Sequence, residues 1–141
     1  MEIIKNSIEF KVVKALDNKF LYKLLKEREL INNISHKKMP TFSQHVKFVK
    51  SKPYAKWYII YKNKKKCGTI YLSKLNEIGL QLKKEEFNQK IEADILKIII
   101  KKNPRARYLV NVNPKNKRKI DFFKKNGFKL IQFTYEMIPE K

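Results

Sequence analysis

The sequence has a single cysteine, Cys67, and no uninterrupted apolar run near the ~18 residues that a membrane-spanning helix requires. One cysteine excludes an internal disulfide, and its place inside an apparent strand is typical of a small buried hydrophobic residue. The first residues lack the basic segment and the long apolar block of a secretory signal. We therefore expect a cytoplasmic protein with no membrane segment, no metal site and no redox chemistry.

Arginine is also scarce, although the chain is strongly basic. The formal net charge is +21, yet 30 of the 34 basic residues are lysine, and Lys, Asn and Ile together make up 59 of the 141 residues. Clustered positive charge favours polyanion binding through counterion release, but arginine is the residue best suited to bidentate phosphate and base contacts. Such a composition is expected from an A/T-rich genome, so we predict no specific nucleic-acid partner and keep association with RNA as an alternative.

What the chain does have is a regular succession of strand and helix patterns. With 43% hydrophobic residues, nine Phe and seven Tyr, its length suits one domain with its own core. Alternating apolar residues predict strands, and apolar residues three and four apart predict helices. The predicted helices begin at or near Asp17, Thr41, Asn88 and Asn113. The predicted strands cover residues 8–13, 56–61, 67–72, 78–82, 108–112 and 128–138.

The stretch from Asn76 to Leu96 organises the chain. Ile78, Leu80 and Leu82 alternate as in a strand, and a helical face of isoleucines follows, so a helix starts near Asn88. The first backbone N–H groups of a helix have no partner inside the helix, and they lie at the positive end of its dipole. A strand that runs straight into a helix therefore predicts an anion site, and we expect the chemistry here.

The C-terminal half carries a family resemblance. Asn113, Asn116, the aromatic pair at 122 and 123, and Gly127 with Phe128 stand in the pattern of the GNAT acetyltransferase superfamily, and residues 33–53 are similar to small bacterial members. The resemblance implies one α/β domain over residues 1–141, a GNAT-like mixed central sheet of about six strands flanked by four helices. Strands separated by helices run parallel in such a sheet, while the middle ones form a meander.

The resemblance further implies transfer of an acetyl group from acetyl-CoA to a primary amine of a small molecule, such as an amino sugar. It allows a homodimer. The acyl carbonyl and pantetheine would lie along the central strand, and the pyrophosphate on the loop before the central helix. The cofactor-binding residues implied in this way are Gly79, Leu80, Leu82, Phe87, Asn88, Gln89, Lys90, Asn113, Asn116, Lys119 and Phe123.

The cofactor loop departs from the family pattern, in which glycines let the backbone curl around phosphate oxygens. The stretch from Phe87 to Ala93 contains no glycine, and Lys90 and Glu92 stand at the glycine positions. Lys90 adds a cation, whereas a carboxylate at position 92 suits the helix dipole but repels a bound anion. The alternative is therefore a GNAT fold that has lost acetyl-CoA binding and acts as a binding or structural domain.

Few residues remain for the chemistry. Glu77 stands where many family members place the base that takes the amine proton, and its alternative is a solvent-facing glutamate at a strand end. The family's acid, a tyrosine, corresponds to Phe123, so Tyr135, another phenol or solvent would have to protonate the thiolate. Asn33 and His36, in a polar loop, are candidates for substrate binding, while His45 lies on an apolar helix face as a core residue would.

Overall fold

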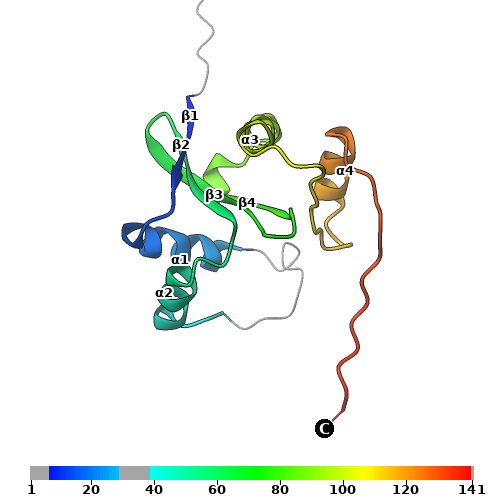
Figure 1. The fold of residues 1–141 in the computed structure, drawn as a ribbon, viewed down its shortest axis with the longest axis horizontal. Coiled ribbons are helices and arrows are strands. Elements are labelled where there is room, and N and C mark those ends of the chain that lie inside the picture. Colours follow the sequence, from blue (N-terminus) through cyan, green and yellow to red (C-terminus); the bar gives the residue numbers. More distant parts are fainter. Residues whose placement is uncertain (1–6, 29–38, 141) are drawn as a thin grey trace, which may run out of the picture.

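A computed structural model describes residues 7–28 and 39–140 of the chain. The elements, in chain order, are β1 (Ile8–Val12), η1 (Ala15–Asp17), α1 (Asn18–Glu27), α2 (Phe42–Lys50), β2 (Lys56–Lys62), β3 (Lys65–Leu72), β4 (Ile78–Leu82), η3 (Lys84–Glu86), α3 (Gln89–Lys102) and α4 (Lys117–Lys125). Figure 1 shows them along the chain. Asn33 and His36 lie outside the described residues.

The four strands form one antiparallel sheet in the order β1-β2-β3-β4. Its second hairpin turns at Asn63 and Lys64, which both have positive φ (51° and 67°), as a two-residue turn of matching twist requires. The lysine-rich connection between β2 and β3 is therefore a tight turn. In the described chain this hairpin is the longest strand pair.

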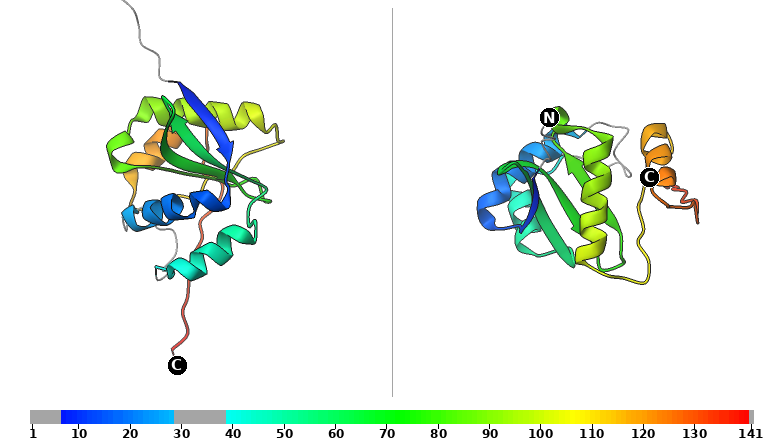
Figure 2. Two further views of the ribbon diagram at one scale, coloured as in Figure 1. Left: turned by 90° about the vertical axis from the view of Figure 1, so that its left-hand side faces the viewer. Right: turned by 90° about the horizontal axis from the view of Figure 1, so that it is seen from above.

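The two faces of the sheet are covered by different helices, as Figure 2 shows from two sides. On β2, Tyr58 and Ile60 belong to a core that includes Ile95 and Ile99 of α3. Ile59, between them, packs instead with residues of α1 and α2. Alternate side chains of a strand point to opposite faces, so one strand serves both layers.

Several helix ends follow the local signals in the sequence. Asn88 caps α3, because its side-chain oxygen accepts hydrogen bonds from the N–H groups of Lys90 (2.9 Å) and Ile91 (3.3 Å). Thr41, the predicted start of α2, forms a capping box with Gln44, with N···O distances of 2.9 and 3.1 Å. Asn126 and Gly127 end α4, and Gly127 has a φ of +90°.

Two helix starts differ in detail from the prediction. Asn113 does not cap α4; its side chain accepts from the N–H of Lys115 (2.9 Å) in a preceding turn, and Asn116 is the N-cap. Either asparagine has the chemistry of a cap, and the proline after the first one favours a turn equally well. Asp17 stands at the N-cap position of α1, but its carboxylate accepts from the Lys14 N–H and from Lys66 Nζ, both at 2.8 Å. The hydrogen bond between the Asp17 carboxylate and the Lys66 ammonium group raises the pKa of Lys66.

The expected sheet of about six strands is not what the structure contains. Residues 108–112 make one parallel bridge, Leu109 with Glu77, rather than a strand, and residues 128–138 join no sheet. An alternating pattern shows which face of an extended segment is apolar, but a strand also needs a neighbouring edge to supply hydrogen bonds. The described sheet is therefore antiparallel, with a single parallel contact at its β4 edge.

Cys67 is buried on β3, as expected of a small hydrophobic residue, and burial raises the pKa of its thiol to about 11. Within residues 7–28 and 39–140, no helix has the length and apolar character needed to cross a membrane. The same residues contain no group of three or more His, Cys, Asp or Glu side chains placed to hold a metal ion.

Candidate functional site

A narrow cleft opens between β4 and the segment that follows the Leu109 bridge, and α4 contributes to its wall. The Ile78 N–H donates to the Leu109 carbonyl (2.8 Å), and the Leu109 N–H donates to the Asn76 carbonyl (2.8 Å). These bonds join the two segments at one point, and no further bridge joins them along the described residues. The cleft volume is about 60 Å³, so the walls must separate to admit a ligand, since ligand pockets usually measure roughly 300–1,000 Å³.

Six of the residues predicted to bind the cofactor line this cleft. They are Gly79, Leu80, Asn113, Asn116, Lys119 and Phe123. Leu82 is buried in the core instead, and the loop residues Phe87, Asn88, Gln89 and Lys90 are exposed outside the cleft lining. The structure does not bring Tyr135 to this site, because its side chain is 90% exposed on the C-terminal segment.

Glu77 lies in the turn that leads into β4, held by two side-chain donors. The Ser73 hydroxyl donates to Oε1 (3.1 Å), and the Asn111 amide donates to Oε2 (2.6 Å). Ser73 also accepts from the Glu77 backbone N–H (3.0 Å), and Asn111 lines the cleft. Glu77 does not itself line the cleft, but its neighbour Ile78 and its partner Asn111 do. The carboxylate is therefore held next to the cleft, rather than free at a strand end.

Tyr71 is a cleft residue that the sequence analysis missed. It lies directly opposite Gly79 in the β3–β4 ladder, and its ring covers that glycine so closely that an added Cβ would lie 2.0 Å from ring atom Cε2. Tyr54 stacks on it with ring centroids 3.8 Å apart. Burial raises the pKa of both phenols. The signal for Tyr71 was the strand register, which a single sequence does not display.

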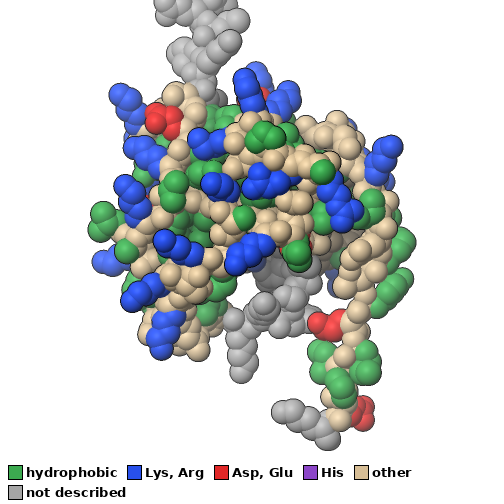
Figure 3. Space-filling model, in the orientation of Figure 1, with side chains coloured by type: hydrophobic (Ala, Val, Ile, Leu, Met, Phe, Trp, Pro, Cys, Tyr) green, Lys and Arg blue, Asp and Glu red, His purple; other side chains and the backbone are tan. Residues whose placement is uncertain are grey.

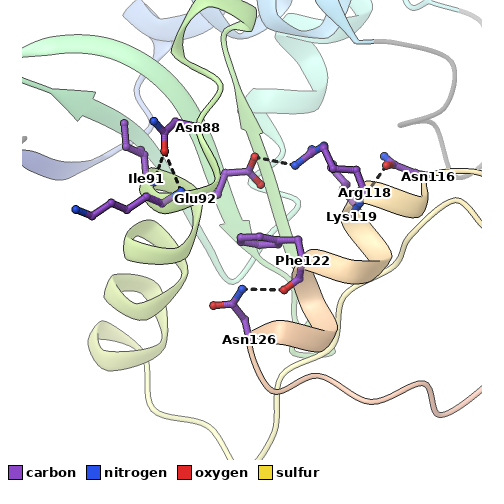
Figure 4. A network of polar contacts seen from close by, with 9 residues as sticks. Asn88, Ile91, Glu92, Asn116, Arg118, Lys119, Phe122 and Asn126 are labelled. Carbon is purple, nitrogen blue, oxygen red and sulfur yellow. Dashed lines mark hydrogen bonds and ion pairs between the residues drawn. The ribbon is translucent and has the colours of Figure 1, made fainter.

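At the other end of the cleft, side chains of the protein already occupy the start of α3, where an anion would otherwise bind (Figure 4). Asn88 already accepts from two of the first N–H groups of the helix. Glu92 is 4% exposed, and its Oε1 lies 3.4 Å from Nη1 of Arg118, whose guanidinium stacks 3.9 Å from the ring centroid of Phe87. Burial raises the pKa of Glu92, although Arg118 and Lys119 oppose the shift.

Lys119 brings a second cation to this end, and burial lowers the pKa of its ammonium group. Its backbone N–H donates to the Asn116 side chain (3.2 Å), which fixes the first turn of α4. Arg28, at the end of α1, lines the same cleft. Arg118 and Lys119 therefore lie close to the one buried carboxylate, and Arg28 adds a third cation to the cleft lining. The excess positive charge favours an anionic ligand.

A larger hollow of about 340 Å³ lies between α1 and α2, lined by Lys19, Lys23, Lys26, Tyr22 and Phe42. Among the described residues, its lining contains no carboxylate and no histidine. The narrow cleft, with oriented polar groups at both ends, is the better candidate for chemistry despite its smaller volume.

No protein-family model matches the sequence, and no curated protein is significantly similar to it. Solved structures do resemble its fold. A domain from Methanocaldococcus jannaschii is 20% identical with a TM-score of 0.77, and the match covers 94% of each chain.

Two further matches are enzymes. The spermidine/spermine N-acetyltransferase SpeG from Vibrio cholerae is 12% identical with a TM-score of 0.70, over 86% of this chain and 79% of that one. The ribosomal L7/L12 alpha-N-protein acetyltransferase RimL, solved with coenzyme A, is 16% identical with a TM-score of 0.68, over 89% and 81%. The predicted resemblance is thus confirmed in three dimensions, and the chain has the fold of the GNAT N-acetyltransferases.

Proposed function

We propose that this protein is an N-acetyltransferase that moves an acetyl group from acetyl-CoA to the primary amine of a small molecule. The observation that carries the proposal is Glu77, a carboxylate that is oriented by Ser73 and by Asn111, a residue of the cleft wall opposite β4. The fold supports it, because structural relatives are N-acetyltransferases and one of them holds coenzyme A. Similarity of fold alone does not establish an activity, so the proposal must rest on the residues of the cleft.

The cleft residues fit acetyl-CoA in part. The absence of a side chain at Gly79 leaves room for the Tyr71 ring on the β4 wall of the cleft. Asn111, Asn113 and Asn116 supply polar groups along the opposite wall. The phosphates cannot use the start of α3 in the usual backbone manner, because Asn88 and Glu92 occupy it. They fit through side chains instead, with Arg118, Lys119 and Arg28 as the cations.

When bound, acetyl-CoA supplies an activated thioester, and the chain supplies proton transfer. A primary ammonium has no lone pair, so Glu77 must take its proton before nitrogen attacks the carbonyl carbon. The C–N bond forms as the C–S bond breaks, and the leaving sulfur needs a proton. Tyr71 replaces Tyr135 in this proposal, because its phenol lines the cleft and can give a proton to the leaving sulfur, which solvent then restores to the phenol.

The experiment is an acetylation assay with a panel of diamines, amino sugars and peptides with free N-termini, read by mass spectrometry and by thiol release. We expect an acetylated amine with wild type, and a strongly reduced rate with Glu77→Gln. Glu9→Gln, a change at an exposed position on β1, is the matched control. Turnover that is equal in all three proteins would remove Glu77 from the mechanism, and no turnover with any amine would argue against the enzyme.

A second function has one observation in its favour. The buried Glu92–Arg118 pair and the Asn88 cap complete the start of α3 without any ligand. A GNAT fold that no longer binds acetyl-CoA, and acts as a binding or structural domain, would need nothing more at this position. Binding measurements on wild type and on Glu92 variants separate the two functions.

A further inference from the structure

The C-terminal segment, residues 129–140, is extended and exposed along its whole length. It nevertheless carries six large apolar side chains that are each at least 64% exposed: Leu130, Ile131, Phe133, Tyr135, Met137 and Ile138. In Figure 3 these follow one another down the segment, whereas Lys and Arg are dispersed over the rest of that face. Contiguous apolar surface of this extent usually marks an interaction site.

We propose that residues 129–138 form a strand on a second copy of this chain, paired with the free edge of residues 109–112, and that the two copies exchange these segments reciprocally. The side chains support a strand with one buried face. Ile131, Phe133, Tyr135 and Met137 occupy alternate positions, and Gln132, Thr134 and Glu136 lie between them. This period of two suits a sheet with one face on a core and one in water.

Residues 109–112 provide an edge that fits. Leu109 bridges only to Glu77 among the described residues, so no described strand lies beside the opposite edge of this segment. Val110, Phe123 and Phe128 pack against the main core but are only partly buried. The other sheet edge, β1, carries exposed Glu9 and Lys11, and charged side chains of this kind protect an edge from pairing.

The direction in which the C-terminal segment leaves α4 favours pairing with a second copy over pairing with residues 109–112 of the same copy. Gly127 turns the chain at φ +90°, the Phe128 N–H donates to the Phe123 carbonyl (3.0 Å), and the two rings pack with centroids 5.4 Å apart. From this fixed point the segment leaves α4 and runs down one side of the molecule, apart from the sheet (Figure 1). Reciprocal exchange gives each copy both a strand and an edge, as a two-fold interface requires.

The available area suits a stable dimer. Phe133 and Tyr135 are 74% and 90% exposed, and an aromatic side chain buries about 150–250 Å² when it is enclosed. Four such rings in two copies supply roughly 600–1,000 Å², before the aliphatic side chains and the covered edges are counted. Stable interfaces bury about 1,200–2,000 Å² in total.

The net charge of the chain predicts how dimerisation should depend on salt. Two copies with a net charge of +21 each repel one another, and salt screens that repulsion. Residues 130–138 carry one charge, that of Glu136, so the strand itself adds little repulsion. Dimerisation should therefore strengthen with added salt, the opposite of what is expected for polyanion binding.

The test uses the full chain in sedimentation equilibrium at low and high salt, with hydrogen exchange at low and high protein concentration. Wild type should be a dimer whose dissociation constant falls with salt, and the amides of 130–138 should become protected only at high concentration. Phe133→Asp, on the apolar face, should give a monomer. Thr134→Asp, with the same added charge on the polar face, should remain a dimer. Both positions are exposed in the single chain, so near-native circular dichroism and thermal midpoints are expected for both variants.

Three results would overturn the proposal. A wild-type monomer at all concentrations would show that the segment has no second copy as partner. Protection of 130–138 that does not depend on concentration would show that the segment folds onto its own edge. A dimer that survives Phe133→Asp would place the interface elsewhere.

Discussion

Oε1 of Glu92 lies 3.4 Å from Nη1 of Arg118, where the first turn of α3 meets the first turn of α4. The same guanidinium stacks on Phe87, so this arginine is held by a carboxylate and an aromatic ring. A phosphate at this position would have to replace the carboxylate as the partner of Arg118. The chain thus carries its own competitor for the anion that its fold is expected to bind.

Replacing Glu92 with Gln should strengthen acetyl-CoA binding. The change removes the competing charge and keeps the size of the side chain, and we expect a gain of about tenfold, or about 1.4 kcal/mol. Calorimetric titration of both proteins measures it. Asp94→Asn is the control, because Asp94 is exposed two residues further along α3. Equal affinity for wild type and Glu92→Gln would show that the phosphates do not approach this pair.

Replacing Glu77 with Gln should lower turnover by roughly 100-fold or more, which is what a general base usually contributes. Affinity for acetyl-CoA should be nearly unchanged, since Gln can still accept a hydrogen bond from Asn111. Initial rates and calorimetry separate the two effects. A variant that lost binding and turnover together would point to a structural role for Glu77 at the β3–β4 turn.

Gly79 and Tyr71 should be coupled energetically. An added Cβ at 79 meets the Tyr71 ring, which Tyr54 holds in a stack, so Gly79→Ala should cost about 1–3 kcal/mol of unfolding free energy through overpacking. The cost should be smaller in a Tyr71→Ala background, where the clash is absent. Urea denaturation of the four proteins gives the coupling energy. Additive effects would mean that the ring moves aside without cost.

His45 should make stability depend on pH. The side chain is buried on α2, its Nε2 has no hydrogen-bond partner among the described residues, and burial lowers its pKa. The folded state therefore takes up a proton less readily than the unfolded state. This contribution is complete above the unfolded pKa of about 6.5 and is lost as the pH falls below it.

The measurement is the unfolding free energy of wild type and His45→Leu at about pH 7.5 and about pH 5.5, on either side of the unfolded pKa. Wild type should lose more stability between the two conditions than His45→Leu does. The same loss in both proteins would assign the pH dependence to other groups.

The positive charge should give only weak RNA binding. The Lys and Arg side chains are dispersed over the face in Figure 3 rather than gathered in one stripe, and diffuse contacts of this kind are lost as salt rises. Fluorescence anisotropy with a short RNA at low and physiological salt tests this. Submicromolar binding that survives physiological salt would instead support an RNA-associated protein.

The sequence predicts best those features that depend on near neighbours. The start of α3 at Asn88 and the start of α2 at Thr41 were both predicted, because each rests on residues within three or four positions. Asn113 misled the prediction of α4 because Asn116, three residues later, offers the same capping chemistry. Local chemistry identifies residues that can cap a helix, but it does not decide between two such residues that lie close together.

Features that join distant parts of the chain were not predicted. Glu92 and Arg118 are 26 positions apart, and the place of Tyr71 over Gly79 depends on a strand register that a single sequence does not display. The last predicted strand has the right alternation but no edge beside it in one copy of the chain. Six of the cleft residues were nonetheless expected from the family resemblance, because they follow the element order rather than individual contacts.

The most direct test of the account is a calorimetric titration of the wild-type chain with acetyl-CoA. The account predicts saturable binding at one site per chain, weaker at high salt because the phosphates meet Arg118 and Lys119, and tighter after Glu92→Gln. No binding by wild type or by Glu92→Gln would contradict it, and would assign this chain to the GNAT folds that have lost their cofactor.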